Sequence, residues 1–199
     1  MQRACSPKYF FSVIRLAGLA MAVAIAGCAS GADRAGGPAS PREQMQGGIQ
    51  AHQARDYESA IAAFRQVTEM ADADRETVIT AWANLGAAYD AAARYQEALD
   101  ALEEARKLAP DRPQIHFNLG RVYTNLGRFA DARTSYLKAA ELQPGNTDIP
   151  YNLGILYEIY LNQPDQALAA YRKYIDMGGP EASRVQGWIA AIEQRGQAK

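Results

Sequence analysis

The sequence predicts an all-α fold, a solenoid of about four helical hairpins followed by a capping helix. Three observations predict it. Ala, the strongest helix former, makes up about a fifth of the 199 residues. Three segments within residues 82–157 recur with a period of 34 residues, and such periods are typical of stacked repeats. Residues 181–195 then carry apolar side chains at helical spacing.

Residues 1–27 form the first element, which we interpret as a secretory signal peptide. Basic side chains precede an apolar run over residues 16–26; they are Arg3, Lys8 and Arg15. The run has 11 residues, too few to cross a membrane as a helix, and it is followed by small residues. The ending Ile25-Ala26-Gly27-Cys28 resembles the bacterial lipobox. This resemblance implies cleavage between Gly27 and Cys28 and acylation of Cys28, as in bacterial lipoproteins.

Residues 28–41 come next and read as the lipidated Cys and a flexible linker, because they are rich in Gly, Ser, Ala and Pro. Cleavage would remove three basic residues and so change the net charge from −1 to −4. It would also remove Cys5, which leaves Cys28 as the one thiol of the mature chain. Two or more acyl chains give stable membrane anchoring. By the sorting rule of such lipoproteins, Ala29 after the Cys favours the outer membrane over the inner one.

Residues 42–180 carry the repeats. The aligned segments share Asn-Leu-Gly followed by Tyr; they are residues 82–89, 116–123 and 150–157. Gly86, Gly120 and Gly154 are therefore 34 residues apart. This pattern resembles the tetratricopeptide repeat, whose period is 34. The resemblance implies units at about 41–74, 79–112, 113–146 and 147–180, each a helix-turn-helix hairpin. We expect Gly of each first helix and Ala of each second helix to let the two backbones approach closely.

Two units depart from the pattern. The first lacks the Leu-Gly-Tyr signature, so we expect its first helix to fray, and four extra residues follow it. The last has one extra residue, which we place at residues 162–165, where Pro164 can open a helix. Residues 181–199 follow as a capping helix and tail, with an apolar stripe of Val185, Trp188, Ile189 and Ile192.

The sequence offers no arrangement typical of catalysis. His52 and His116 stand apart, whereas metal sites and His-dependent triads need clustered groups. The near-neutral charge lacks the basic patch of a nucleic-acid binder. We therefore expect no enzyme activity, no cofactor, no metal and no nucleic-acid partner.

A partner site follows from the family resemblance, because the first helices of such repeats line a concave groove. The positions that face it include an apolar strip with hydrogen-bonding neighbours: Phe117, Asn118, Arg121, Tyr151, Asn152 and Ile155. The same positions in the first two units are occupied by residues such as Ile49, His52, Asn84 and Ala87. Since the second unit contributes Ala there, we expect a depression at that point. The strip suits an extended peptide or a helix.

The function predicted from the sequence is that of a non-catalytic scaffold or adaptor. It would be lipid-anchored in the bacterial envelope, facing the periplasm, and would bind another envelope protein or a peptide segment of it. Two alternatives remain open: a pilotin-like assembly factor for a pilus or secretion complex, and a structural protein that self-associates, for example as a homodimer.

Overall fold

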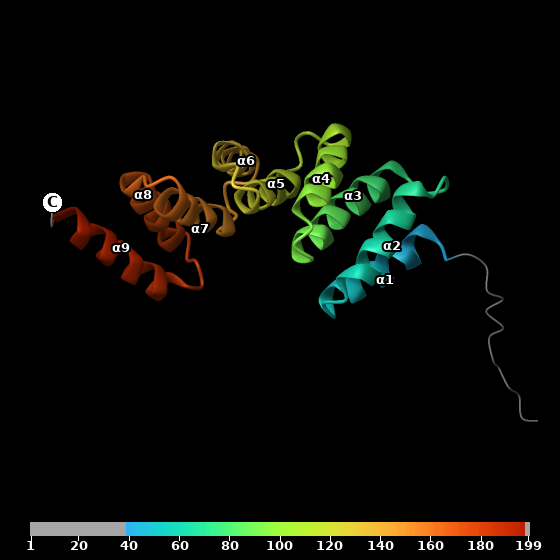
Figure 1. Cartoon of the computed structure of the whole chain (residues 1–199), viewed down its shortest axis with the longest axis horizontal. Helices are drawn as coiled ribbons and strands as arrows, with labels where there is room; N and C mark the ends of the chain where they lie inside the picture. The colour runs from blue at the N-terminus through green and yellow to red at the C-terminus, as the bar shows by residue number, and fades with distance from the viewer. Residues whose placement is uncertain (1–38, 198–199) are drawn as a thin grey trace, which may run out of the picture. The chain divides into compact units, whose positions relative to one another are not determined.

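The computed structural model describes residues 39–197 (Figure 1). The predicted signal peptide, Cys28 and the linker up to residue 38 lie outside the described residues, so these assignments stay predictions. The helices, in chain order, are α1 (Pro41–Gln53), α2 (Tyr57–Glu69), α3 (Arg75–Ala91), α4 (Tyr95–Leu108), α5 (Pro113–Asn125), α6 (Phe129–Leu142), α7 (Asp148–Ile155) with its π-helical extension η1 (Leu156–Tyr160), α8 (Pro164–Asp176) and α9 (Ala182–Gln197).

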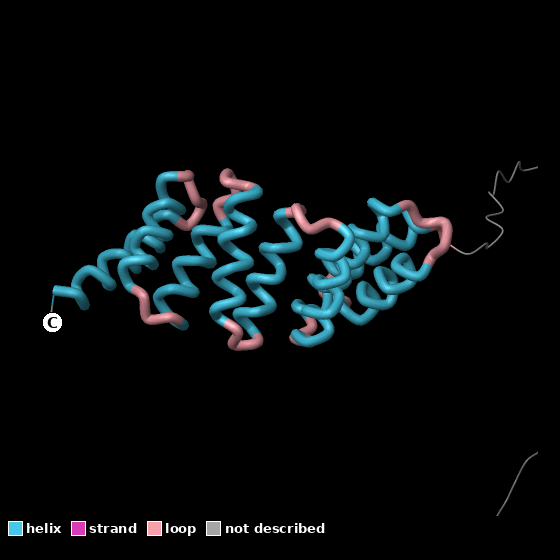
Figure 2. The backbone as a smooth tube through the Cα atoms, turned by 90° about the horizontal axis from the view of Figure 1, so that it is seen from above, coloured by secondary structure: helices cyan, strands magenta, loops and turns pink. Residues whose placement is uncertain are grey.

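Successive helices pair as antiparallel hairpins, α1 with α2, α3 with α4, α5 with α6, and α7 with α8. Within residues 39–197 the chain consists of helices and loops, with no strand (Figure 2). Each hairpin also contacts the next one, α2 against α3, α4 against α5 and α6 against α7. α9 packs on α8 after the last hairpin. The predicted fold class, an all-α solenoid of four hairpins with an added final helix, is confirmed.

The first helix is complete, so the expectation that it frays is wrong. Pro41 occupies its first turn, and Ser40 and Glu43 form a capping box in which the Glu43 carboxylate accepts from the Ser40 backbone N–H at 3.0 Å. A capping box satisfies N–H groups that a helix start otherwise leaves unpaired. Asp74 caps α3 in a related way, because its carboxylate accepts from the Thr77 backbone N–H at 2.9 Å.

The extra residue of the last unit lies in η1 and not at residues 162–165 as predicted. All four hairpin turns contain one residue with positive φ; these are Arg55, Ala93, Gly127 and Asn162. The signature Tyr123 lies four positions before its turn residue, whereas Tyr157 lies five before Asn162. The wider turn of η1 accommodates this residue. In a π-helix each N–H donates to the carbonyl five residues earlier, and here the Leu161 N–H donates to the Leu156 carbonyl at 3.0 Å. Pro164 does open α8, at its first position.

The glycines of the first helices pack against large side chains of the second helices. A Cβ on Gly120 would lie 2.6 Å from the ring of Tyr136, and one on Gly86 would lie 2.5 Å from Leu102. The Cβ on Gly86 would also lie 3.2 Å from the Ala98 carbonyl, which confirms the predicted close backbone approach at this hairpin. The prediction named only the small Ala of each second helix. In the structure each of these glycines mainly makes room for a Leu or an aromatic ring of that helix.

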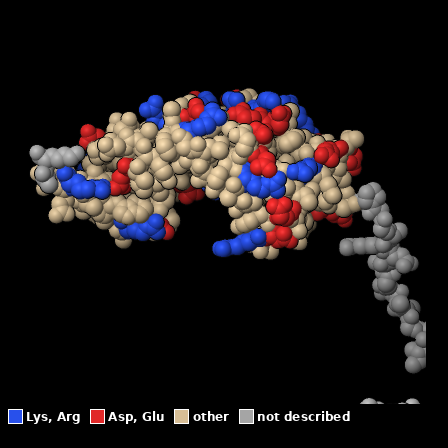
Figure 3. Space-filling model, viewed as in Figure 1, with Lys and Arg blue, Asp and Glu red and all other residues tan. Residues whose placement is uncertain are grey.

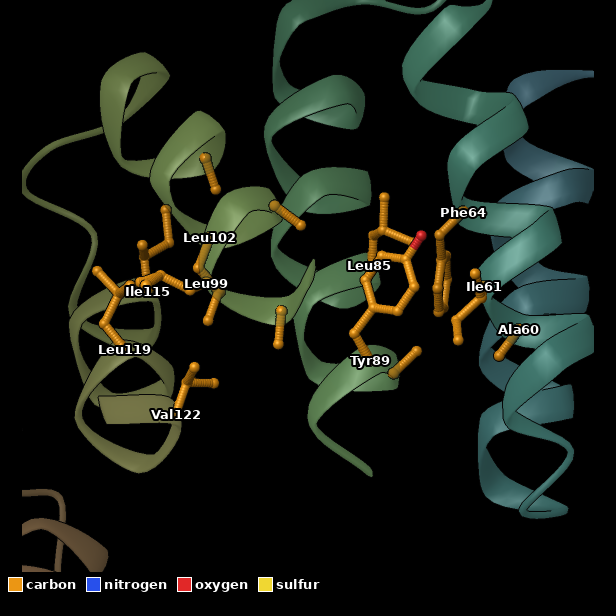
Figure 4. Close-up of a cluster of buried hydrophobic side chains, with 14 of the residues drawn as sticks. Ala60, Ile61, Phe64, Leu85, Tyr89, Leu99, Leu102, Ile115, Leu119 and Val122 are labelled. Atoms are coloured by element: carbon orange, nitrogen blue, oxygen red, sulfur yellow. The ribbon is translucent and has the colours of Figure 1, made fainter. Parts of the chain in front are cut away.

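The core consists of three clusters that follow one another along the hairpins. The first lies between α2 and α5 and contains Phe64, Leu85, Leu102 and Leu119 (Figure 4). Half-buried signature tyrosines join the clusters, since Tyr123 packs against the first and the second, and Tyr157 against the second and the third. Stacked repeats thus share apolar surface that a single hairpin could not bury alone.

Candidate functional site

The predicted apolar strip is divided between two parts of the fold. Phe117 is half-buried, and its ring lies 5.8 Å from that of Tyr136. Burial raises the pKa of Tyr136 to about 12, so this hydroxyl stays neutral at ordinary pH. Tyr151 and Ile155 instead pack against the α8–α9 cluster. The Tyr151 hydroxyl accepts from Arg184 of α9 at 2.8 Å, so part of the predicted strip already has an intramolecular partner.

The polar residues of the predicted site differ in the hydrogen bonds and ion pairs that they already form within the chain. Arg121 forms an ion pair at 2.8 Å with Asp90, whose side chain is only 4% exposed. Asn125 donates to the same carboxylate at 2.8 Å, so Asp90 ties α3 to α5. The Asn152 amide donates to the Asp148 carbonyl of its own helix at 2.7 Å. Among residues 39–197, the Asn118 side chain forms no hydrogen bond and is the predicted polar group that stays free.

A cavity of about 160 Å³ lies between α1 and α3, where the small Ala side chains of the second unit predicted a depression. Its walls include Ile49, His52, Asn84 and Ala87, which all stand at positions predicted to face the groove, together with Phe64. Ile49 is 42% exposed, unusually high for a large apolar side chain. The depression predicted from the sequence is therefore present, at the opposite end of the repeat array from Tyr151 and Ile155.

The wall of this cavity includes a histidine, His52, with an unpaired ring nitrogen. Its Nε2 atom is buried and has no hydrogen-bond partner among the described residues, and its ring contacts Tyr57 edge-to-face at 5.5 Å between centroids. The Asn84 amide likewise has no partner in that part of the chain. An unpaired buried polar group costs about 1–3 kcal/mol. The sequence places His52 among the groove-facing positions, and the side chain does line this cavity; its unpaired Nε2 is not evident from the sequence.

The residue types that bind metals lie apart in the described part of the chain. Between residues 39 and 197, no three His, Cys, Asp or Glu side chains gather in a way that could hold a metal ion. His116 is buried, and its Nε2 lies 2.5 Å from the Pro110 carbonyl, to which it donates. None of the helices in this part is long and apolar enough to cross a membrane.

Comparison with known proteins supports the family resemblance. A family model described as tetratricopeptide repeat matches residues 83–147. No curated protein matches the chain in sequence. MamA (MSR-1) is a similar solved structure, 24% identical, with a TM-score of 0.63 over 78% of this chain and 87% of its own. The fold is that of a tetratricopeptide-repeat solenoid.

Two further solved structures agree with this fold. YrrB is 21% identical, with a TM-score of 0.61 over 74% of this chain and 73% of its own, and is described as a tetratricopeptide-repeat protein with an unusual peptide-binding site. BtubC from P. vanneervenii is 17% identical, with a TM-score of 0.65 over 77% of this chain and 71% of its own. At these identities the likeness establishes the fold, and the partner has to be argued from the side chains of this chain.

Proposed function

We propose that this protein is a non-catalytic scaffold of the bacterial envelope that binds a segment of a partner protein on its concave face. The cavity between α1 and α3 carries the proposal, because it combines the exposed Ile49 with the unpaired polar groups of His52 and Asn84. Apolar contact would supply binding free energy, and the half-buried Asn84 amide would fix the orientation of the bound segment. The peptide-binding description of YrrB agrees with a peptide ligand for such a fold.

The proposed segment begins in this cavity and continues toward Asn118 and Phe117 on α5. Both side chains stand at groove-facing positions, and neither is covered by α9 in the way that Tyr151 is. The bound segment would therefore use the first three hairpins, and α9 would close the groove at the fourth. This modifies the site predicted from the sequence, in which Tyr151 and Ile155 were direct ligands.

The proposed location rests on the sequence of residues 1–41. A signal peptide ending in Gly27, acylation of Cys28 and a linker to α1 would hold the solenoid at a periplasm-facing membrane surface, with the outer membrane favoured by Ala29. A scaffold held there would meet partners that share the same compartment, and a linker of the predicted flexible composition would let the concave face turn toward them.

Filling the cavity tests this function. Ala87→Trp should abolish recovery of the partner after chemical crosslinking in intact cells, because an indole occupies the space between Ile49 and Asn84. Ala190→Trp, on the exposed side of α9, adds the same side chain elsewhere and should leave recovery unchanged. Both variants are checked for helicity and thermal stability. Equal recovery by the two folded variants would refute the proposed site.

A further inference from the structure

Three cavities recur on the other side of the first helices, away from the groove positions. They lie between α2, α3 and α4, between α4, α5 and α6, and between α6, α7 and α8, with volumes of about 370, 370 and 300 Å³. Equivalent residues one repeat apart line them, for example Trp82, His116 and Pro150. We call them the α2–α4, α4–α6 and α6–α8 cavities. The repeat therefore builds one outer cavity at each junction between hairpins.

The α2–α4 cavity is acidic. Four carboxylates line it, from Glu69, Glu97, Asp100 and Glu104, together with the guanidinium of Arg65. Glu97 and Glu104 form ion pairs with Arg94 and Lys107. Two of them, Glu69 and Asp100, form no ion pair within residues 39–197. The half-buried Trp82 forms part of the wall. Carboxylates beside an aromatic ring suit a cationic group, since both attract positive charge.

An arginine of the chain itself already contacts an aromatic ring in this cavity. The Arg65 guanidinium lies over the Tyr89 ring, 6.0 Å from its centroid, and donates to the Tyr89 hydroxyl. This contact involves neither Glu69 nor Asp100. The Asp100 carboxylate accepts from the Gln96 amide at 3.0 Å and keeps acceptor capacity for a second cation. Charged side chains gather over the α1–α4 half in Figure 3, whereas the surface over α5–α8 is mostly uncharged in that view.

The α4–α6 cavity has balanced charge and unpaired polar groups at its base. Its charged residues are two acids and two bases, Glu103, Asp131, Arg106 and Lys138. His116 and Ser135 are each only 9% exposed and line the cavity. Because His116 Nε2 donates to the Pro110 carbonyl, its Nδ1 is left as an acceptor in the neutral ring. The Ser135 hydroxyl has no partner within the described helices. Both groups suit an uncharged side chain that donates and accepts hydrogen bonds.

The α6–α8 cavity is apolar. Ile149, Leu153 and Tyr157 line it, Lys173 is its one charged residue, and Leu137 at its edge is 48% exposed. The charged groups thus change along the row of cavities, from two carboxylates without an ion pair, through balanced acids and bases, to a single lysine. An apolar side chain of a partner would bury Leu137 and its neighbours here.

We propose that this row of outer cavities is a second interaction surface, which binds an extended segment of a partner protein. The segment places a basic side chain in the α2–α4 cavity, an uncharged hydrogen-bonding side chain in the α4–α6 cavity and an apolar side chain in the α6–α8 cavity. This surface is separate from the concave cavity that carries the proposed function, because the residues that line the two share no position on α3.

A synthetic peptide tests the proposal. It carries two Arg at one end and two Leu at the other, joined by about ten Gly and Ser residues so that the linker does not impose a distance. Binding of the fluorescein-labelled peptide to the purified full-length protein in mild detergent is followed by anisotropy at low salt. The joined peptide should bind about tenfold or more tighter than either half alone, because the second contact becomes intramolecular.

Substitutions in the two outermost cavities test each end of the bound peptide separately. Asp100→Asn combined with Glu104→Gln should weaken binding severalfold, and Ala170→Trp, which fills the α6–α8 cavity, should remove the advantage of the Leu end. Glu181→Gln combined with Glu193→Gln removes the same charge from the α9 region and should have no effect. Circular dichroism checks the fold of each variant.

Three results would overturn the proposal. The joined peptide could bind no better than its halves, or the two double variants could weaken binding equally. Binding could also be abolished by Ala87→Trp and retained by the Asp100 and Glu104 variant, which would place the peptide in the concave cavity. The partner-recovery experiment on the concave face is independent of these outcomes, so either proposal can fail alone.

Discussion

Replacing Gly120 with Ala tests the packing on which the solenoid depends. A Cβ at this position would lie 2.6 Å from two ring atoms of Tyr136 and 2.9 Å from a third. Carbon atoms in ordinary contact are about 3.5–4.0 Å apart, so the ring or the helix has to move by about 1 Å. Tyr136 is only 2% exposed, so other side chains enclose its ring. Overpacking of this kind costs about 1–3 kcal/mol, and the better helix propensity of Ala offsets about 0.5–1 kcal/mol of it.

We therefore expect Gly120→Ala to lower the free energy of unfolding by about 1–2 kcal/mol, measured by urea denaturation at constant m-value. Gly187→Ala is the matched control, because nothing lies within 4 Å of a Cβ at Gly187 in α9. It should raise stability by about 0.5–1 kcal/mol. In a Tyr136→Ala background the Gly120 substitution should cost less, since the clashing ring is gone. Gly120→Leu should lose more than Gly120→Ala. A Gly120→Ala protein as stable as its parent would refute the assigned helix packing.

Three further predictions concern charges and the anchor. Asp90→Ala should lower the free energy of unfolding by about 1–3 kcal/mol in the same assay, because it leaves Arg121 and Asn125 without their shared partner; an unchanged midpoint would show that this link between α3 and α5 is dispensable. Hydrogen bonds from Thr77 lower the pKa of Asp74, so its stabilising contribution is present above the unfolded value of about 3.9 and is lost as pH falls through the folded pKa. Asp74→Asn should thus reduce the drop in melting temperature on acidification, and an identical acid profile for both proteins would contradict the cap. Cys28→Ala should yield an unprocessed precursor without lipid on a gel of membrane fractions, and normal maturation would exclude the lipobox.

The repeat architecture could be predicted from the sequence because its determinants are local and periodic. Leu, Gly and Tyr recur at 34-residue intervals, and each places the same packing contact in the next unit. The final helix was predicted from its apolar stripe, and Val185 and Ile192 are indeed buried against α8. The predictions that were wrong concern details within single repeat units. Ser40 and Glu43 stabilise the start of α1, which lacks the repeat signature, and sequence reasoning did not weigh this capping box.

The extra residue of the last unit was misplaced for a physical reason. A Pro and several polar residues are the usual signs of a longer loop, and residues 162–165 contain Pro164 and three polar residues. The helix instead widened at η1, which keeps Asn162 in the turn geometry of the other hairpins. No local residue preference marks a π-helical turn, so the sequence alone favoured the loop.

The candidate site was predicted in part. The depression beside Ala87 followed from residue size at groove positions, and the cavity lies there. The engagement of Tyr151 by Arg184 and of Arg121 by Asp90 could not be predicted, because each joins residues from different units whose side-chain directions depend on packing. The outer cavities, which Trp82, His116 and Pro150 line, were not predicted from the sequence.

Site-specific photo-crosslinking in living cells tests the central claim most directly. A benzoylphenylalanine in place of Ala87 would stand in the cavity between α1 and α3, and one in place of Ala190 would stand on the exposed side of α9. We predict one discrete crosslinked partner from position 87 in the membrane fraction and none from position 190. The same pattern of adducts from both positions, or no adduct from position 87 in a folded and processed protein, would contradict a partner-binding concave face.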